Sequence, residues 1–140
     1  MNAEERKCVI VMDEKLPAGL VANTAAILGL TLGKKAPDLV GRDTVDGAGR
    51  THLGIINVTL PILKSNAENL RTLRDQLYGQ EYADLTVVDF SATAQHCKDY
   101  EDYVTRSVSV PPEHHCYYGL ALYGPKKTVN KLTGSLPLLR

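Results

Sequence analysis

Short apolar runs alternate along the chain with longer segments in which apolar residues recur at helical spacing. The runs Lys7–Met12, Leu85–Phe90 and Tyr117–Tyr123 are continuous, as is typical of strands that are buried on both faces. Gly54–Leu63 is also β-rich until Pro61, which lacks a ladder donor and indicates a strand end or edge. The pattern therefore predicts four strands, with helices between them.

The segment 17–33 predicts the first helix. Pro17 suits a first helical turn and Gly33 suits a C-terminal cap. The helix is apolar almost all round, so we expect it to lie largely buried against the sheet. Asn23 and Thr24 are polar side chains in its interior and need hydrogen-bond partners there.

Three further helices follow from caps and apolar spacing. A capping box at 65–68 starts a helix that ends near Gly79, with leucines along one face. Ser91 is expected to cap a helix over 91–107, and a short helix through Leu132 ends at Gly134. The residues expected to be buried by the 91–107 helix are Ala94, Cys97, Tyr100 and Val104.

Alternating strands and helices indicate an α/β fold. We expect one domain over residues 1–140, with a four-stranded mixed sheet between layers of helices, a three-layer sandwich.

The segment 36–53 has little periodicity and contains the stretch "DGAGRTH". Long ordered loops in compact domains are often functional, and Arg50, Thr51 and glycine amides can hold an anion. The alternative is that the glycines serve turns and that Arg50 pairs with Asp43 or Asp46. The loop fits no nucleotide-binding motif. Its candidate ligand-binding residues are Asp46, Gly47, Gly49, Arg50, Thr51 and His52, to which Asn23 and Thr24 are added.

The charges balance, with 16 basic and 16 acidic residues, which argues against a nucleic-acid partner. The four positive charges after Glu113 (Lys126, Lys127, Lys131 and Arg140) form only a modest patch. Three widely spaced cysteines suit a reducing cytoplasm. No apolar run approaches the roughly 20 residues that cross a bilayer, so no membrane association is expected.

Both ends of the chain carry a family likeness. The opening "CVIVMDEKLPAGLVANTAA" and the closing "LALYGPKKTVNKLTGSLPL" resemble the matching strand, turn and helix segments of the type II peptidyl-tRNA hydrolases. The resemblance implies that family's α/β fold. A homodimer is expected from the resemblance, and also because the apolar edge of so small a sheet gains by being covered.

The departures from that family concern its chemistry. Leu20 stands where the family has a lysine before Val-Ala, and "DFSATAQ" replaces its Asp-Ala-Gly-Arg-Thr loop while keeping Asp89 and Thr93. The chain therefore resembles a divergent branch of unknown function more than the working hydrolases. The stretch "DGAGRT" is similar to that family's Asp-Ala-Gly-Arg-Thr loop, but it lies before the second predicted strand instead of after the third. It can lie near Asp89 only if both are at the same end of the sheet.

Asp89 is the candidate catalytic residue, as a general base or an orienting group. The alternative is a helix N-cap carboxylate. His114, His115 and Cys116 are of metal-binding type, but neighbours on a strand point to opposite faces, so no metal or other cofactor is predicted.

Three functions are consistent with these features of the sequence. The first is the binding of a small molecule or anion, with hydrolysis of an ester or amide as an extension, and it predicts a pocket near Asp89. The second is residual peptidyl-tRNA hydrolysis with Lys15 or a C-terminal lysine in the missing role, which also needs a continuous basic surface. The third is a non-catalytic interaction module, which predicts a filled core at Asp89 and an exposed apolar patch.

Overall fold

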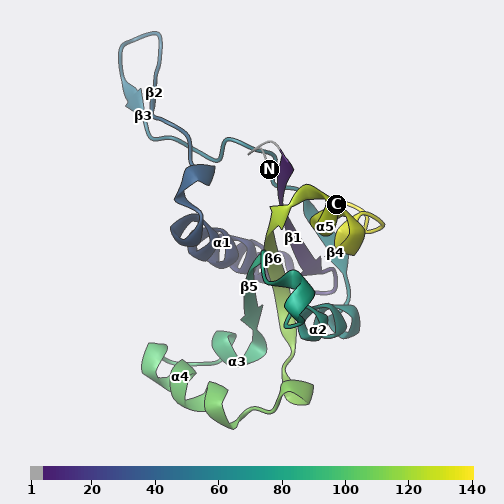
Figure 1. Cartoon of the computed structure of the whole chain (residues 1–140). Helices are drawn as coiled ribbons and strands as arrows, with labels where there is room; N and C mark the ends of the chain where they lie inside the picture. The colour runs from purple at the N-terminus through teal and green to yellow at the C-terminus, as the bar shows by residue number, and fades with distance from the viewer. Residues whose placement is uncertain (1–4) are drawn as a thin grey trace.

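The computed structural model describes residues 5–140 and has the predicted α/β architecture (Figure 1). The strands are β1 (Arg6–Asp13), β2 (Thr44–Val45), β3 (Thr51–His52), β4 (Ile62–Ser65), β5 (Thr86–Ser91) and β6 (Tyr117–Pro125). The α-helices are α1 (Ala18–Lys35), α2 (Ala67–Gln76), α3 (Ala92–Gln95), α4 (Tyr100–Ser109) and α5 (Lys126–Thr133).

The main sheet within the described residues has the strand order β4-β1-β6-β5. β1 runs parallel to β4, with Ile10 opposite Ile62, and antiparallel to β6, with Ile10 opposite Ala121. β5 runs antiparallel to β6. The sheet is therefore mixed, as predicted.

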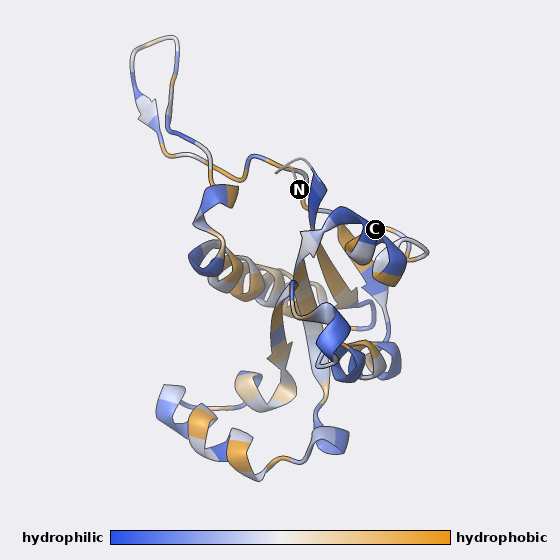
Figure 2. Ribbon diagram, viewed as in Figure 1, coloured by the Kyte–Doolittle hydropathy of each residue, from blue (hydrophilic) through white to orange (hydrophobic). Residues whose placement is uncertain are grey.

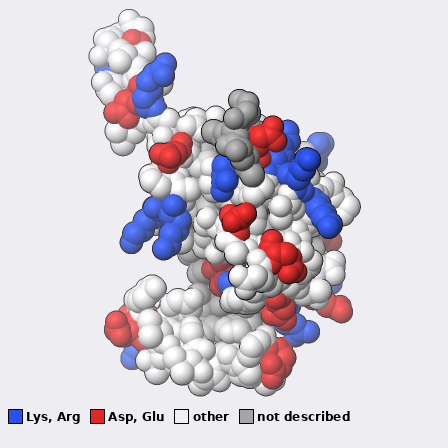
Figure 3. All heavy atoms as spheres, in the orientation of Figure 1, with Lys and Arg blue, Asp and Glu red and all other residues white. Residues whose placement is uncertain are grey.

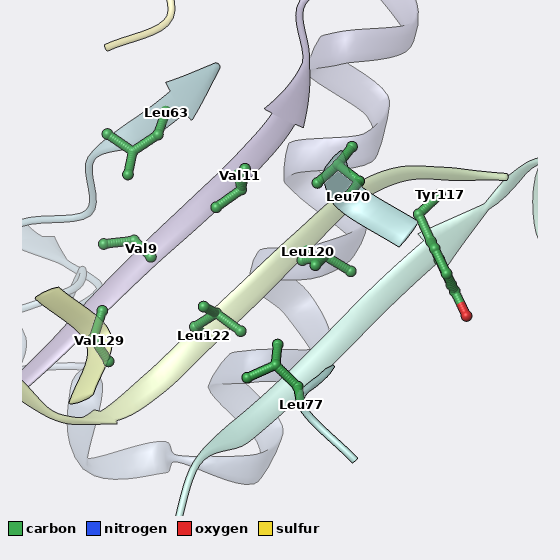
Figure 4. Packing of buried hydrophobic residues seen from close by; sticks show 9 residues of the cluster. All are labelled: Val9, Val11, Leu63, Leu70, Leu77, Tyr117, Leu120, Leu122 and Val129. Atoms are coloured by element: carbon green, nitrogen blue, oxygen red, sulfur yellow. The ribbon is translucent and has the colours of Figure 1, made fainter. Parts of the chain in front are cut away.

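One face of the sheet packs against α2 and α5 (Figure 4). Leu70 and Leu77 of the α2 segment and Val129 of α5 meet strand residues such as Val9 and Leu122. Asn66 caps α2 by accepting a hydrogen bond from the Asn69 amide at 2.8 Å, so the cap lies one residue later than the box starting at Ser65 predicts. Gly134 is the C-cap of α5, as predicted.

The other face of the sheet is covered by α1, which completes the three layers. Leu28 and Leu32 are buried against Ile10, Met12 and Ala121. The helix lies so close to β6 that a Cβ on Gly119 would come within 3.1 Å of Thr24 Cγ2 and of Leu28 Cδ1.

The expectation that α1 is largely buried is wrong. Only Thr24, Leu28 and Leu32 of α1 are buried, and Leu30 is 80% exposed. One sheet covers one side of a helix, so the apolar residues on the far side remain at the surface. The helix also continues past Gly33 to Lys35, with Ala36 as its C-cap.

The two edges of the main sheet differ. The C-terminal segment lies along β4, where the Lys64 amide donates to the Pro137 carbonyl at 2.8 Å and the Leu139 amide donates to the Ile62 carbonyl at 2.8 Å. The outer edge of β5 has no strand beside it within residues 5–140. One edge is thus covered and the other is open.

Residues 40–58 form an arm that leaves the body at the end of α1 and carries the β2–β3 hairpin at its tip (Figure 1). The arm closes at its base, where the Gly41 amide donates to the Ile55 carbonyl at 2.9 Å. A Cβ on Gly54 would lie 1.8 Å from the Gly41 carbonyl oxygen, so this crossing requires glycine.

Two predicted elements differ from those observed. The strand expected over 54–63 begins only at Ile62, because residues 54–58 belong to the arm. The helix expected over 91–107 is broken into α3 and α4, because Asp99 accepts a hydrogen bond from the Asp102 amide at 2.8 Å and starts a new helix.

Among residues 5–140, no helix has the length and apolar character needed to cross a membrane.

Candidate functional site

A cleft of about 550 Å³ lies beside β5, between α1 and the lobe formed by α3 and α4. Figure 3 shows this lobe set off from the body by a hollow on the α1 side. The residues that line the cleft are Ile27, Thr31 and Lys35 from α1, Thr86, Val87, Val88, Asp89 and Phe90 from β5, and Ala94, Cys97, Asp99, Tyr100 and Tyr103 from the lobe.

The floor of the cleft is the open edge of the sheet. The lining residues 86–90 are five consecutive positions of β5. Val88 and Phe90 pack with the α1 side of the sheet, while Val87 packs with the α2 side. The cleft therefore contacts both faces of one strand, which a pocket on the face of a sheet does not.

Asp89 is the acidic group on this floor, and its partner is Arg74 of α2. Arg74 Nε donates to Asp89 Oδ2 at 2.8 Å, and the side chains are only 11% and 24% exposed, respectively. The guanidinium carbon also lies 4.0 Å from the centre of the Tyr78 ring. A hydrogen bond and a stacked ring hold the guanidinium, so Asp89 is a positioned carboxylate whose charge is compensated.

Asp89 does not cap a helix, which was the alternative role for this residue. Ser91 Oγ accepts from the Ala94 amide at 3.3 Å and caps α3, as the sequence predicts for this serine. The carboxylate of Asp89 accepts its hydrogen bond from Arg74 instead, and Asp89 lines the cleft.

Two tyrosines surround the carboxylate. Burial, and then the negative charge of Asp89, raise the pKa of Tyr103 above its ordinary value and raise the pKa of Tyr117 to about 12. Both phenols therefore stay protonated at neutral pH and can donate hydrogen bonds. Tyr117 is buried in the core, as its strand position predicts, and Tyr103 lines the cleft.

Cys97 also lines the cleft but is not arranged as a nucleophile. Its thiol lies 2.9 Å from the Thr93 carbonyl oxygen. Burial, followed by the charge of Asp102, raises the pKa of this thiol. A thiol that keeps its proton is a poor nucleophile at neutral pH.

Of the two polar residues predicted on α1, Asn23 faces the lobe and Thr24 faces the sheet. Asn23 Nδ2 donates to Gln95 Oε1 of α3 at 3.4 Å, which ties the helix to the lobe. Thr24 is fully buried, and its Oγ1 has no hydrogen-bond partner within the described part of the chain. Neither residue lines the cleft.

The arm holds the remaining predicted site residues, and its β2–β3 hairpin lies far from β5, the strand that carries Asp89 (Figure 1). Asp46 Oδ1 accepts from the amides of Ala48 and Arg50 at 2.8 and 3.0 Å, and Asp46 Oδ2 lies 2.8 Å from His52 Nε2 and 3.4 Å from Arg50 Nε. The hydrogen bond from His52, then those from the two amides, lower the pKa of Asp46. Arg50 thus pairs with Asp46, which is the alternative arrangement that the sequence allows for this loop.

The remaining arm residues build the turn. Gly47 lies at its tip, Gly49 has a φ of 81° that favours glycine, and Thr51 pairs with Val45 in the hairpin ladder. The structure therefore brings Asp46, Arg50 and His52 together but does not bring the arm to Asp89.

The model of a protein family of unknown function, DUF2000, matches residues 6–140. The chain belongs to this family. A solved protein of unknown function from Agrobacterium tumefaciens is 18% identical to this DUF2000 chain, with a TM-score of 0.85 over 96% of this chain and 97% of that one. That likeness shows a shared fold. No curated protein matches the chain.

The candidate site residues that the sequence of this DUF2000 protein does not mark are Arg74, Tyr103 and Thr31. Arg74 reads as a polar position on an amphipathic helix, and only the tertiary fold brings it to Asp89. Tyr103 and Thr31 likewise have no local motif. The pairing of two tyrosines at 100 and 103 was the one available signal, since aromatic residues on a polar helix favour an interface.

His114, His115 and Cys116 do not form part of a metal-binding cluster in the described residues. Within residues 5–140 there is no group of three His, Cys, Asp or Glu side chains placed to hold an ion. His115 instead stacks on Tyr117, with ring centres 5.6 Å apart.

Proposed function

We propose that this chain binds a small organic ligand in the cleft along β5. The observation that carries the proposal is the position of Asp89, which lies on the floor of a mostly apolar cleft and is held there by its hydrogen bond with Arg74. Binding sites for small molecules are concave, mostly apolar and provided with a few fixed polar groups. Ligand binding needs only such a pocket, whereas residual peptidyl-tRNA hydrolysis also needs a continuous basic surface and an interaction module predicts a filled core at Asp89.

The polar groups narrow the chemistry of the ligand. Arg74 compensates the charge of Asp89, so the carboxylate favours a hydrogen-bond donor rather than a free cation. Asp99 and Asp89 both line the cleft, against one cation, Lys35. This balance disfavours an anionic ligand here. The proposed ligand is neutral, with an apolar body and an N–H or O–H group for Asp89.

Ligand-observed NMR with a library of neutral fragments tests the proposal. Thr31→Trp places an indole at the wall of the cleft, and Leu30→Trp places the same side chain one residue away, at a position that does not line the cleft. We expect fragments to bind the wild type and Leu30→Trp but not Thr31→Trp. Equal binding by both variants would remove the cleft as the site.

Kinship with the type II peptidyl-tRNA hydrolases is a second part of the proposal. The two segments that carry the resemblance are neighbours in the fold, because β1 pairs with β6 along seven positions and Lys7 Nζ donates to Asn130 Oδ1. Leu20 still occupies the place of the family's lysine, so we expect no turnover of N-acetylaminoacyl-tRNA. Turnover that is lost in Asp89→Asn would instead make the cleft the active site of a hydrolase.

A homodimer in a reducing cytoplasm belongs to the same proposal. Cys8, Cys97 and Cys116 are free thiols, which suits such a compartment. The arm supports self-association, because Val45, Leu53 and Ile55 are between 67% and 81% exposed in one copy.

A further inference from the structure

We propose that the ligand of this cleft is an extended peptide that pairs with β5 as a fifth strand of the sheet. The inference rests on the proposed function, since it assigns a ligand class to the same cleft. Its basis is that the floor is made of five consecutive residues of an open strand edge, and not of isolated side chains.

An open strand edge presents a periodic row of backbone groups. In an antiparallel pair, every second residue of a strand directs its N–H and C=O to the same neighbour. β6 is the strand that pairs with β5 in the described part of the chain, so the alternate groups of β5 point toward the cleft. A peptide backbone has donors and acceptors at the matching spacing, and strand addition is an established mode of peptide recognition.

The other edge of the sheet shows how this chain covers a strand. The C-terminal segment meets β4 through the amides of Lys64 and Leu139, and Leu138 bridges to Leu63. No corresponding segment within residues 5–140 runs along β5. Exposed edges invite pairing, and natural proteins usually block them. Here the edge is left open inside a walled cleft.

The walls favour a single strand as the occupant. Ile27 and Thr31 of α1 lie on one side and Tyr100 and Tyr103 of the lobe on the other. Another folded sheet would have to bring its own covering helices between these walls. A lone strand has only its side chains to place, and five residues span about 17 Å.

Side chains on β5 alternate between two environments, which predicts the pattern of the peptide. Val88 and Phe90 belong to the apolar α1 side, and Asp89 meets Arg74 on the α2 side. Side chains opposite each other on paired strands lie on the same face of the sheet. The peptide should therefore alternate apolar residues with a neutral donor-bearing residue such as glutamine or serine that reaches Asp89.

The test uses a positional-scanning library of N-acetylated, C-amidated pentapeptides against the isotope-labelled full chain. Expected are enriched peptides with the alternating pattern, nuclear Overhauser contacts between peptide amides and residues 86–90, and slower hydrogen exchange at alternate β5 amides. Binding should persist in Leu30→Trp and be lost in Thr31→Trp.

Backbone pairing is separated from side-chain recognition by N-methylation. Methylating a peptide amide that faces β5 should weaken binding at least about tenfold, while methylating an amide that faces away should not. Equal losses of affinity from the two kinds of methylation would overturn the inference. If neutral fragments bind the cleft and the whole library does not, the peptide inference fails while the proposed function stands. If neither binds, both fail. If self-association slowed hydrogen exchange at the β5 amides in the absence of peptide, the occupant of the cleft would be a second copy, and the peptide inference would also fail.

Discussion

At the scale of single residues, the Asp89–Arg74 pair is the feature on which the site depends. Asp89→Ala leaves a guanidinium that is only 11% exposed without its carboxylate. Removing one partner of a largely buried charged hydrogen bond costs more than the pair itself contributes, so we expect the free energy of unfolding to fall by about 1–3 kcal/mol. Urea denaturation measures the change.

The matched control for this substitution is Arg106→Ala. Arg106 Nε also contacts a carboxylate, that of Asp102, at 3.0 Å, but the arginine is mostly exposed. Solvent screens such pairs, and their removal changes stability little. If the two variants unfolded at the same urea concentration, Asp89 would not be held as the structure implies.

Tyr117 leads to a prediction for alkaline pH. Burial raises its pKa in the folded chain from 10.0 to about 12, so between these values the unfolded chain has lost a proton that the folded chain keeps. The unfolded state is then favoured, and stability falls as the pH rises from about 10 to 12. Tyr117→Phe should flatten this decline, as measured by urea denaturation at several pH values. An unchanged decline would contradict the assignment to Tyr117.

The candidate residues show where reasoning from sequence works at this scale. Asp89 is identifiable because a carboxylate at the end of an apolar strand is an exception to its surroundings. Arg74 is not, because it lies on another element and polar residues on an amphipathic helix are common. Asp46 and Arg50 are found together as a pair, but their sequence pattern does not distinguish a loop that binds an anion from one that binds its own carboxylate.

At the scale of elements, burial decides which patterns can be interpreted. The runs that became β1 and β6 were predictable because buried central strands are continuously apolar. The run that became β5 has the same pattern although β5 lies at an edge of the sheet. Residues 54–58 are also β-rich but belong to the arm, and local propensity does not separate such a stretch from a strand of the sheet. The break between α3 and α4 had a signal in Asp99, whose capping role competes with continuation of the helix.

The C-terminal segment gives a prediction about the covered edge. Deleting residues 137–140 removes the two backbone hydrogen bonds to β4 and the contact of Leu139 with the α1-side core. We expect a loss of about 2–4 kcal/mol in the free energy of unfolding, together with aggregation through the newly exposed edge. Thermal unfolding and light scattering measure the two effects.

Deletion of Arg140 alone is the control for this truncation. It shortens the chain but keeps Pro137 and Leu139, which make the contacts with β4. Stability equal to the wild type is expected. A large loss here would place the effect in the terminal charge and not in the covered edge.

At the scale of the whole molecule, the three-layer body could be predicted from the sequence, whereas the arm and the α3–α4 lobe could not. The three-layer body encloses two apolar clusters, one on each face of the sheet, and its class could be deduced from the order of strands and helices. The arm and the α3–α4 lobe extend away from it (Figure 1). Figure 2 shows apolar segments on α4. The side chains of Tyr100 and Val108 on this helix are 74% and 85% exposed. Apolar spacing predicts a buried face, but it does not say which chain buries it.

The arm makes the homodimer testable. Its strands β2 and β3 have two residues each, and an isolated hairpin is marginally stable in water, so a covering surface would stabilise it. If a second copy provides that surface, Leu53→Asp combined with Ile55→Asp should convert a dimer into a folded monomer in sedimentation equilibrium. Val108→Asp, at an 85% exposed position of the α3–α4 lobe that does not line the cleft, should remain dimeric. Weak contacts between protein molecules begin to be populated at about 100 μM. If the wild type sedimented as a monomer at this concentration, the arm would be exposed in solution, and its apolar surface would be assigned to a partner other than a second copy.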